Sequence, residues 1–515
     1  MDVGDGSLPI DAAGFDMAVD LKILLENLPV TGYDPAFPTI IRGFTNDSRN
    51  IKPGDIFVAV AGTKLAGSDF LPDAQARGAA GAIVDASLTV PAGVTIPLLR
   101  VADARAALSF LAKVYYGDPS NELLVDAFVG TKGKTTSAFM AKSVVEAGFG
   151  SGKAAVIGTL GAYGGGIEER TGLTTPESAE LQRLLAAFLD AGVEQVSIEY
   201  TAHAIALGRG RDIRFRTGVF ISFSQDHLDF FGDMEEYLQV KVRFFEEHVA
   251  QPDFMALVNI DDPSAFRFLE ATVGCSLTFG MLGRGDIRAE GMRTERGKTA
   301  FDLIFDEEIV PVEINTVGSY NVHNALGAAG LGIRHGIALE AVAAGLNAFE
   351  PVPGRLEAIR EGQPFEVLVD YAHSPQSVKA VLKGVSGLGY RRIIAVMGAG
   401  GDRDRAKRPL IGEALMRGAD VVIITSDNPR SEEPTAIIEE ILVGVRSSGI
   451  AKEYVAEPDR YRAIKMALEI ALAGDAVLIL GKGAEDYQEI AGVKYPFDDR
   501  NVCRELLREM HSRWI

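Results

Sequence analysis

"FVGTKGKTTS", residues 128–137, follows an apolar run and leads into a helical pattern, "TTSAFMAKSVVEAG". In this order of strand, loop and helix, glycines let backbone N–H groups approach phosphate oxygens, which the helix N-terminus also attracts. The standard pattern G-x-x-x-x-G-K-[ST] would need glycine in place of Phe128, so only the shorter run from Gly130 to Thr135 remains. The stretch predicts a shortened phosphate-binding loop, in which Lys134 reaches the β and γ phosphates and Thr135 suits Mg²⁺. The alternative is a glycine-rich turn that merely starts a helix.

The composition is that of a soluble, acidic protein. A chain of 515 residues is too long for one core and predicts about two to four domains. Its 47% hydrophobic and 24% charged residues are ordinary for a globular protein. The net charge of −20 disfavours nucleic acid and anionic membranes as partners. Any anionic substrate must therefore be held by local cations and helix N-termini.

Cysteine usage and the chain start point to a cytoplasmic protein. Cys275 and Cys503 lie far apart and belong to no metal-spacing or redox pair, so we interpret them as inert thiols in a reducing compartment. The start, "MDVGDGSLPID", is acidic rather than basic, and no apolar run approaches membrane-spanning length. We expect a soluble cytoplasmic monomer with no membrane insertion and no nucleic acid partner.

Two seams divide the sequence into three domains. "YGDPSNE" (116–122) precedes the phosphate loop, and "FEPVPGRLE" (349–357) follows a helical stretch. The predicted domains are residues 1–118, 119–350 and 351–515. Within them helical stretches alternate with short apolar, often β-branched runs, namely "AAVIG", "EQVSIEY", "TGVFIS", "MALVNI", "EVLVDY", "RIIAVMG", "DVVIITS" and "AVLILG". This alternation predicts an α/β fold with parallel sheets, whose ligands lie beyond the carboxyl ends of the strands.

Two polar residues follow such strands. Glu199 ends "EQVSIEY", and His227 lies in "VFISFSQDHLD" after the next strand. A carboxylate at a neighbouring strand end suits a nucleotide-bound metal, and an imidazole can complete the coordination of a second ion. Taken alone, either residue would more often be structural, but beside a phosphate loop both become candidate ligands. A GTPase would carry N-K-x-D downstream, which this sequence lacks.

The motifs together resemble the Mur ligases of peptidoglycan synthesis, ATP-dependent amide-forming enzymes that use G-x-x-G-K-[ST]. The likeness runs from about residue 40 over nearly the whole chain. It includes, in family order, "NDSR", "PGDIFVAVAG", "GTKGKTT", "LTTPES", "IEYTAH", "SQDHLDFFGDMEEY", "GSYNVHNALGAAG", "VPGRLE", "DYAHSPQS", "GGDRDRAKRP", "SDNPRSEEP" and "GKGAEDY". The set is most similar to the MurE type, which adds the third residue to UDP-N-acetylmuramoyl-L-alanyl-D-glutamate.

The resemblance implies a three-domain architecture and a reaction. It implies an N-terminal UDP-sugar-binding domain, a central P-loop ATPase domain and a Rossmann-like C-terminal domain for the amino acid. ATP would phosphorylate the D-glutamate side-chain carboxylate, and the incoming amine would displace phosphate from the acyl phosphate. Because phosphoryl transfer depends mainly on positioning and charge neutralisation, Lys134 and Mg²⁺ ions are assigned to the transferred group.

The resemblance also assigns the catalytic and nucleotide residues. The catalytic set is Lys134, Glu199, His227 and Lys241, and the metal set is Thr135, Glu199, His227 and Lys241. Lys241 corresponds to the lysine that the family carries as a carbamate, a carboxylate-like metal ligand; without the resemblance, it would be interpreted as a solvated helix lysine. The ATP-binding set is Gly130, Thr131, Lys132, Gly133, Lys134, Thr135, Thr136, Asn324 (adenine), Asp370 (ribose), and Arg355 and His373 (phosphates). His373 has an equal alternative as a structural residue, because Ser374 and Pro375 are typical of a helix cap and first turn.

The resemblance assigns five residues to the UDP-N-acetylmuramoyl-dipeptide. They are Ser48, Thr174, Thr175, Thr201 and Arg209, whose hydroxyl and guanidinium groups suit a diphosphate and a carboxylate. Some positions depart from the family pattern: Leu207 stands for a common glutamine, Ser222 for asparagine, Ala66 and Ser68 for an acidic residue and a histidine, and Ala484 for histidine. These departures concern the uridine and peptide contacts, and the ATP and metal residues keep the family pattern.

The identity of the added amino acid rests on three strand ends of the C-terminal domain. If these strands are parallel neighbours, their loops meet in one crevice. The residues assigned to it are Arg403, Asp427, Asn428, Pro429, Arg430, Gly481 and Glu485. Arg430 can bind a second carboxylate bidentately, and the "DNPR" segment matches diaminopimelate-adding members, so we expect meso-diaminopimelate rather than L-lysine. Arg430 as a surface loop residue is the alternative, and lanthionine carries the same end groups as diaminopimelate.

Other functions remain open at this point. A folylpolyglutamate-synthetase-like ligase shares the phosphate loop and the carbamate, but would not be expected to carry "DNPR" or this N-terminal domain. A dinucleotide-binding module around "MGAGGDRD" would need glycine where Arg403 stands. A binding protein without ATP chemistry would release no ADP in the presence of the dipeptide substrate.

Overall fold

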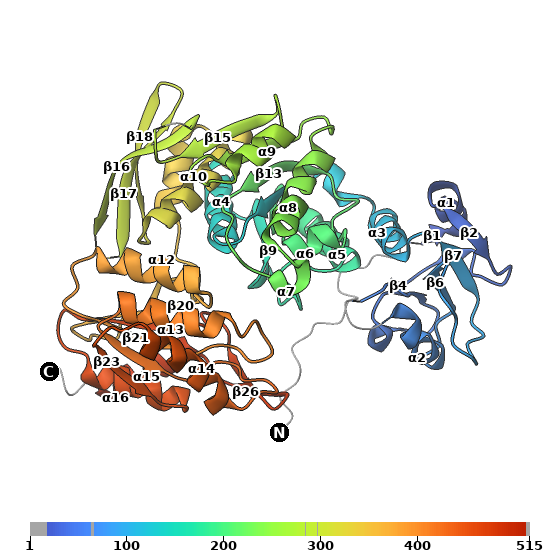
Figure 1. Ribbon diagram of the computed structural model, residues 1–515. Helices are drawn as coiled ribbons and strands as arrows, with labels where there is room; N and C mark the ends of the chain where they lie inside the picture. Colours follow the sequence, from blue (N-terminus) through green and yellow to red (C-terminus); the bar gives the residue numbers. More distant parts are fainter. Residues whose placement is uncertain (1–17, 63–65, 284, 296, 511–515) are drawn as a thin grey trace. The chain divides into compact units, whose positions relative to one another are not determined.

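The computed structural model describes residues 18–62, 66–283, 285–295 and 297–510 (Figure 1). The acidic start of the chain, residues 1–11, on which the prediction of no targeting segment rests, lies outside the described residues. The chain forms two compact units. The first takes in residues up to Ala127, Ser151–Gly218 and Ala250–Phe254, and the second takes in Phe128–Gly150, Val219–Val249 and the residues from Met255 onward. The domain boundaries after residues 118 and 350 stay predictions.

The N-terminal sheet of the first unit has the strand order β2-β7-β6-β5-β4. All neighbours are parallel except the β2–β7 pair. Alternate residues of a strand point to opposite faces, so Ile56 and Val58 pack in one buried cluster with α3, and Phe57 packs in another with α2. The elements are α1 (Leu21–Asn27), β2 (Val30–Tyr33), β4 (Phe44–Thr45), β5 (Ile56–Val58), α2 (Leu71–Ala76), β6 (Gly81–Asp85), β7 (Leu98–Val101) and α3 (Ala104–Tyr115).

A central sheet contributes to both units, because residues of β8 and β13 belong to each. In the first unit the order is β11-β10-β9-β12-β8-β13. Strands β9 and β12 are parallel and fully buried, as expected for strands covered on both faces. The antiparallel additions β10 and β11 were not predicted. The elements are β8 (Leu124–Val129), β9 (Ala154–Gly158), β10 (Gly161–Gly164), β11 (Ile167–Glu169), α5 (Ser178–Asp190), β12 (Gln195–Glu199), α6 (Ala202–Ala206) and β13 (Phe215–Phe220).

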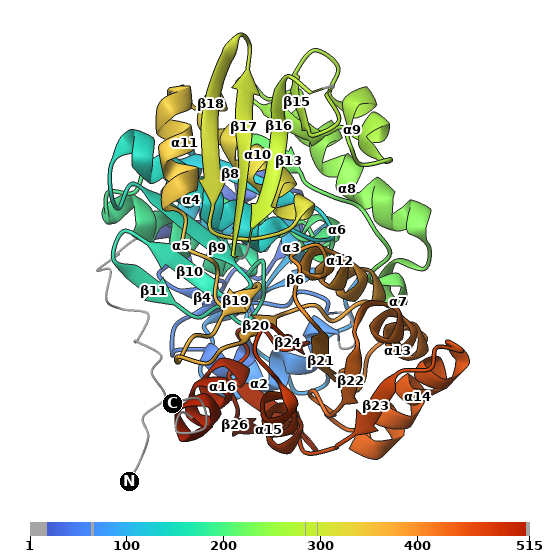
Figure 2. The same ribbon diagram turned by 90° about the vertical axis from the view of Figure 1, so that its left-hand side faces the viewer.

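In the second unit the same sheet continues from β8 and β13 in the order β14-β15-β16-β17-β18. Figure 2 shows β16, β17 and β18 side by side as an antiparallel extension, which was also not predicted. Helices α10 and α11 pack against α4, the helix after the phosphate loop. The elements are α4 (Lys134–Phe149), α7 (Leu228–Phe231), α8 (Met234–His248), β14 (Met255–Asn259), α9 (Ala265–Ala271), β15 (Ser276–Gly280), β16 (Ile287–Glu295), β17 (Lys298–Phe305), β18 (Glu308–Ile314), α10 (Ser319–Arg334) and α11 (Leu339–Ala348).

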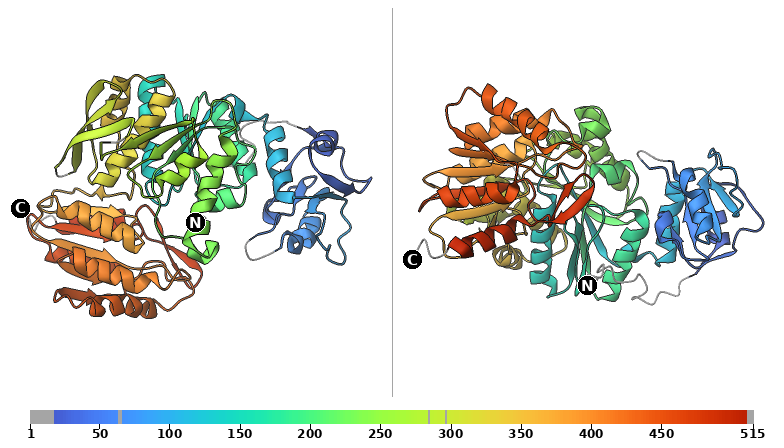
Figure 3. Two further views of the ribbon diagram at one scale, coloured as in Figure 1. Left: turned by 45° about the horizontal axis from the view of Figure 1, so that its top comes forward. Right: turned by 90° about the horizontal axis from the view of Figure 1, so that it is seen from below.

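The C-terminal sheet of the second unit has the order β19-β20-β24-β21-β22-β23. It is parallel except at β19. Figure 3 shows helices on both of its faces, and two buried clusters place α12, α13 and α14 on one face and α15 and α16 on the other. The elements are β19 (Glu357–Ala358), β20 (Glu366–Asp370), α12 (Pro375–Ser386), β21 (Ile393–Met397), α13 (Lys407–Gly418), β22 (Val421–Ile424), α14 (Pro434–Ser447), β23 (Glu453–Ala456), α15 (Arg460–Ile470), β24 (Ala476–Leu480), β25 (Tyr487–Ile490), β26 (Val493–Pro496) and α16 (Asp499–Met510). The predicted α/β class is confirmed.

Candidate active site

The phosphate loop is formed as predicted between β8 and α4. Gly133 has φ of +88°, and a Cβ atom there would lie 2.3 Å from the Oδ1 atom of Asn324. Glycine is therefore needed both for the turn and for the close approach of α10. Helix α4 begins at Lys134, so the positive end of its dipole lies at the loop, which is the arrangement expected for binding an anion.

Side chains of the second unit brace this loop. Lys134 folds back and donates from Nζ to the carbonyl oxygens of Gly130 and Thr131, at 2.8 and 3.2 Å. The hydroxyl of Ser222 accepts the Lys132 N–H at 3.1 Å and donates to the Lys132 carbonyl at 2.9 Å. Ser222, a departure from the family pattern, is thus a direct support of the loop.

An aspartate missed by the sequence analysis lies between two lysines. Asp226 accepts hydrogen bonds from Lys132 Nζ at 3.1 Å and from Lys407 Nζ at 2.8 Å. Burial alone would raise the Asp226 pKa, but Lys132, His227 and Lys407 hold that pKa well below its usual value. The carboxylate stays ionised and ties the loop to the first turn of α13. The sequence signal for this contact lies in two family motifs: "SQDHLD" contains Asp226, and "AKRP" contains Lys407.

Lys241 is buried rather than solvated. Its side chain on α8 is 1% exposed, so the interpretation as a solvated helix lysine is wrong. Its Nζ donates to the Gly130 carbonyl at 3.2 Å and lies 4.5 Å from the ring centroid of Tyr237. Burial, and then the charges of Lys134 and Lys132, lower the Lys241 pKa well below 10.5 against the opposing effect of Asp226. The shift favours the neutral amine, which is the nucleophilic form of lysine.

The predicted metal residues belong to different units. His227 begins α7 with φ of +53° and is exposed in the second unit, whereas Glu199 is buried in the first. Over residues 18–62, 66–283, 285–295 and 297–510, no three His, Cys, Asp or Glu side chains are grouped so as to hold a metal ion. The predicted set contains only two such residues, with a hydroxyl and a lysine, so metal binding stays a prediction.

The other predicted nucleotide residues lie in the second unit. Arg355 donates to the Thr135 hydroxyl at 3.3 Å and stacks on the ring of Tyr371. Asp370 is buried and accepts the backbone N–H groups of Leu356 and Ala372, and burial raises its pKa. Arg355 thus lies at the phosphate loop. Asp370 holds the backbone at Leu356 and Ala372, in addition to the ribose contact that is predicted for it.

Two further nucleotide predictions concern Asn324 and His373. Asn324 is buried under the loop, where it accepts from Ser137 and donates to Asn321. His373 is exposed and directly precedes the Ser374 cap of α12, with Pro375 in the first turn as predicted. Contact of either residue with ATP stays a prediction.

In the first unit, the predicted substrate hydroxyls cluster around Glu199. Thr175 donates to the Glu199 carbonyl at 2.6 Å and pairs with the hydroxyl of Thr201 at 3.1 Å. The Glu199 carboxylate accepts the N–H and hydroxyl of Thr159, whose hydroxyl also meets that of Thr174. Thr159 was missed, although it directly follows strand β9.

An ion-pair network supports this cluster. Arg209 donates to the Thr175 carbonyl at 2.9 Å and pairs with Glu177, which also binds Arg105. Ser48 is buried in a short 3-10 helix, Ser48–Asn50, of the N-terminal sheet region. The structure thus brings together Thr174, Thr175, Thr201, Arg209 and Glu199, and it leaves Ser48 apart from that network.

The loops after β21, β22 and β24 meet at the carboxyl edge of the C-terminal sheet, since these strands are parallel neighbours. A Cβ atom on Gly401 would lie 1.9 Å from the Pro429 carbonyl, so the glycines of "MGAGGDRD" serve close loop packing. Arg430 donates from Nη1 to the Gly401 carbonyl at 2.7 Å, and its Nε lies 3.6 Å from Glu489. With a side chain only 20% exposed, Arg430 is not a solvated surface residue.

Other predicted residues complete this edge. Asn428 donates to the Glu485 carboxylate at 2.7 Å, and Gly481 lies close to Asp427. Arg403 is exposed and approaches Gly400. Two participants were missed, Lys482 and Glu489, because charged residues in a polar loop are typical of solvent exposure.

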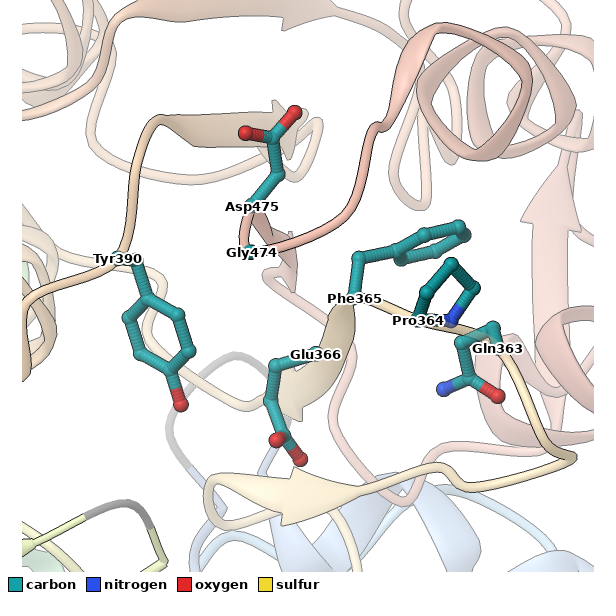
Figure 4. Close-up of a pocket in the computed structure, with 7 residues that line it drawn as sticks. All are labelled: Gln363, Pro364, Phe365, Glu366, Tyr390, Gly474 and Asp475. Atoms are coloured by element: carbon teal, nitrogen blue, oxygen red, sulfur yellow. The ribbon is translucent and has the colours of Figure 1, made fainter.

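A pocket of about 200 Å³ lies at the opposite edge of the same sheet (Figure 4). Residues 363–366 lead into β20, and Gly474 and Asp475 lead into β24, so the pocket is at the amino ends of the strands. Asp475 already pairs there with Arg391 and Arg392. Ligands of open parallel sheets bind at the carboxyl edge, so we do not assign the site to this pocket.

The described residues contain no helix that is both long and apolar enough to span a membrane. Cys275 and Cys503 are free thiols, and burial raises the pKa of Cys503 well above its usual value.

Family models match three segments of the chain. One described as "Mur ligase family, catalytic domain" matches residues 40–116, "Mur ligase middle domain" matches 129–332, and "Mur ligase, glutamate ligase domain" matches 354–483. These matches confirm the predicted three-domain architecture.

Relatives match over almost their full length. A UDP-N-acetylmuramoyl-L-alanyl-D-glutamate--2,6-diaminopimelate ligase of Solibacter usitatus is 40% identical over 470 residues, covering 91% of this chain and 94% of that protein. A protein of the same name from Geobacillus kaustophilus is 40% identical over 494 residues, covering 95% and 99%.

Solved structures agree. A ligase of the same name shares 29% identity with a TM-score of 0.63, covering 92% of this chain and 95% of that chain. A folylpolyglutamate synthase of Mycobacterium tuberculosis, with 19% identity, a TM-score of 0.60 and coverage of 73% and 92%, shares the fold alone. The resemblance inferred from the motifs is confirmed.

Proposed function

This chain belongs to the Mur ligase family, and we propose that it joins meso-2,6-diaminopimelate to UDP-N-acetylmuramoyl-L-alanyl-D-glutamate at the expense of ATP. The observation that carries the choice of amino acid is that the loops of Arg430 and Glu485 both lie at the carboxyl edge of the C-terminal sheet. The relatives named as 2,6-diaminopimelate ligases, 35–40% identical, support it.

The two side chains match the far end of the amino acid. Diaminopimelate ends in a carboxylate and an ammonium, which suit the Arg430 guanidinium and the Glu485 carboxylate respectively. L-lysine brings only the ammonium, so it would forgo the charge-assisted pair with Arg430, which is worth about 1.5–3 kcal/mol. Lanthionine has the same end groups as diaminopimelate and is the competing substrate that this chemistry allows.

Amide formation requires an activated carboxylate. An oxygen of the D-glutamate side chain attacks the γ-phosphorus, the bond from that phosphorus to the bridging oxygen breaks, and ADP leaves. The diaminopimelate amine then attacks the acyl carbon, loses its proton, and expels phosphate. Lys134, at the start of α4, stabilises the charge on the transferred group, and Arg355 lies beside it at Thr135.

The residues present fit the predicted metal and carbamate. Lys241 is buried and faces two lysines, and among the described residues its Nζ makes no ion pair. Attack of this amine on CO₂, with loss of one N–H proton, gives an anion that offsets the excess positive charge. Mg²⁺ would be held by Thr135, Glu199, His227 and carbamylated Lys241, and it would neutralise phosphate charge.

The hydroxyl and arginine cluster of the first unit supports a dipeptide site. Thr174, Thr175, Thr201 and Arg209 supply donors to a carboxylate, and Ser48 supplies a hydroxyl for the UDP portion. We further propose that the protein acts as a monomer in the cytoplasm. The reducing conditions of that compartment suit its free thiols.

The test is phosphate release with UDP-N-acetylmuramoyl-L-alanyl-D-glutamate and, in parallel, meso-diaminopimelate, L-lysine or lanthionine. We expect the highest kcat/KM with meso-diaminopimelate, and loss of turnover in folded Lys134→Ala and Glu199→Ala variants. Faster turnover with lysine, or near-normal turnover in either variant, would overturn the proposal.

A further inference from the structure

Lys482 is a fully buried cation at the carboxyl edge of the C-terminal sheet. It follows β24 between Gly481 and Gly483, and its side chain is 0% exposed. Neither the phosphate loop nor the residues assigned to the amino acid include it. A buried ammonium is costly unless its N–H groups are all satisfied, so its partners define its task.

The Lys482 ammonium has three acceptors, one for each N–H. They are the Glu485 Oε2 atom at 3.1 Å, the Asn428 Oδ1 atom at 3.2 Å and the carbonyl of Tyr487. No N–H group is left for a ligand. Lys482 therefore acts through the residues that it binds.

The contacts of Lys482 fix the orientation of the Asn428 amide. Its Oδ1 atom accepts from Lys482 and from the backbone N–H of Glu489 at 2.9 Å, and both partners can only donate. The oxygen must therefore face them, and Nδ2 must face Glu485, to which it donates at 2.7 Å. A flipped amide would place N–H groups against a cation and an N–H.

The same contacts select one oxygen of Glu485. Oε2 accepts from both Lys482 and Asn428, whereas Oε1 has no hydrogen-bond partner within the described part of the chain. The Glu485 side chain is 26% exposed, so Oε1 can be reached by a ligand. An ammonium group is the complementary ligand for such an oxygen.

Lys482 also connects to the loop that carries Arg430. Glu489, which donates its N–H to Asn428, accepts the backbone N–H of Arg430 at 2.9 Å through its own carbonyl. Gln488 donates to the Asp427 carbonyl at 2.8 Å. One hydrogen-bond network thus links the anionic part of the site, Glu485, with its cationic part, Arg430.

We propose that Lys482 is a positioning residue for the incoming amino acid. It orients Glu485 and, through Asn428, the Arg430 loop, so that Glu485 meets the ammonium and Arg430 the carboxylate at the far end of the same diamino acid. This inference rests on the proposed function and deepens it. A purely structural lysine would affect stability or all substrates equally, whereas a positioning residue affects one substrate.

The experiment measures KM for meso-diaminopimelate, ATP and UDP-N-acetylmuramoyl-dipeptide by phosphate release in Lys482→Met, Glu485→Gln and the double variant. In Lys482→Met we expect KM for meso-diaminopimelate to rise about 20-fold or more, with the other two KM values within about threefold. In the Glu485→Gln background, the same substitution should raise that KM by less than about tenfold, because one of the two groups that Lys482 orients is gone.

Lys452→Met is the matched control. Lys452 lies in the same domain and donates to the Ala419 carbonyl at 2.8 Å, away from this network, so all KM values should stay unchanged. If Lys482→Met does not fold, Lys482→Gln, which keeps two N–H donors, should show the same selective rise in KM.

Three results would overturn the inference: an unchanged KM for meso-diaminopimelate, an equal rise for all three substrates, or fully multiplicative effects in the double variant. Absence of turnover in the wild-type protein with any diamino acid would instead refute the proposed function, so the two failures are distinguishable.

Discussion

Two buried lysines, one beside the phosphate loop and one beside the Arg430 loop, are handled in opposite ways. Lys241 has one carbonyl acceptor and faces the positive charges of Lys134 and Lys132. Lys482 has three acceptors, one of them a carboxylate. Burial alone therefore does not decide the role of a lysine. An amine with few acceptors is available for chemistry, whereas an ammonium with three acceptors orients its partners.

The strongest loss of activity is expected from replacing Lys241, the lysine with few acceptors. Lys241→Met should lower kcat by about 10³-fold or more, since the variant cannot form the carbamate that would hold a metal and offset the loop charge. Added bicarbonate or a short carboxylate should restore part of the activity, measured by phosphate release. Lys142→Met, on α4 and paired with Glu146, is the control and should keep normal activity. An unmodified amine in a high-resolution map of the active enzyme would argue against the carbamate.

Next in size is the effect of the guanidinium that Lys482 supports. Arg430→Ala should raise KM for meso-diaminopimelate by about 10²-fold, because the second carboxylate loses a charge-assisted pair. KM for ATP should not change, and the preference over L-lysine should disappear. Steady-state kinetics with both amino acids measure this. An unchanged preference would show that another group reads the carboxylate.

Stability should separate the two lysines directly. Lys482→Met should lower the free energy of unfolding by about 1–3 kcal/mol, because buried amide and carbonyl oxygens lose their donor. Lys241→Met should leave it unchanged or raise it, since an unfavourably buried amine is replaced by an apolar side chain of similar length. Urea unfolding of both variants in CO₂-free buffer gives the comparison. An equal loss of unfolding free energy in the two variants would contradict the different roles assigned to Lys482 and Lys241.

The pH dependence of unfolding gives a last comparison of the two lysines. Burial lowers the Lys241 pKa below that of the unfolded chain, so the unfolded chain binds more protons between the two pKa values. The free energy of unfolding of the wild type, relative to Lys241→Met, should therefore rise with pH by up to about 1.4 kcal/mol per unit. Unfolding in CO₂-free buffer between pH 7 and 9 measures it. Parallel curves for the two proteins would contradict the lowered pKa.

Much of the fold was readable because each parallel strand is a short apolar run with its ligand loop directly after it. The β21, β22 and β24 runs were predicted, and their adjacency brings Arg430 and Glu485 to one edge. The antiparallel strands β16, β17 and β18 were missed, because their mixed polar sequence carries no comparable signal.

Sequence patterns predicted those site residues that belong to a motif with a fixed geometry, and they missed the charged residues that are buried. Glycines, Lys134 and the following helix predict the phosphate loop. Asp226 and Lys482 do not, because a charged residue in a polar segment is usually solvent-exposed, and only long-range contacts reveal the burial. The tertiary partners, Lys407 and Asn428, lie too far along the chain for local patterns to find.

The loop of residues 427–430 is already held in place by backbone hydrogen bonds to the β25 strand and to Gly401. A loop that is ordered in advance gives up little conformational entropy when a ligand arrives. For inhibitor design, this means that affinity at this edge should follow the fit and rigidity of the small molecule itself. Compounds that carry a fixed ammonium–carboxylate pair should gain more than flexible ones of equal size.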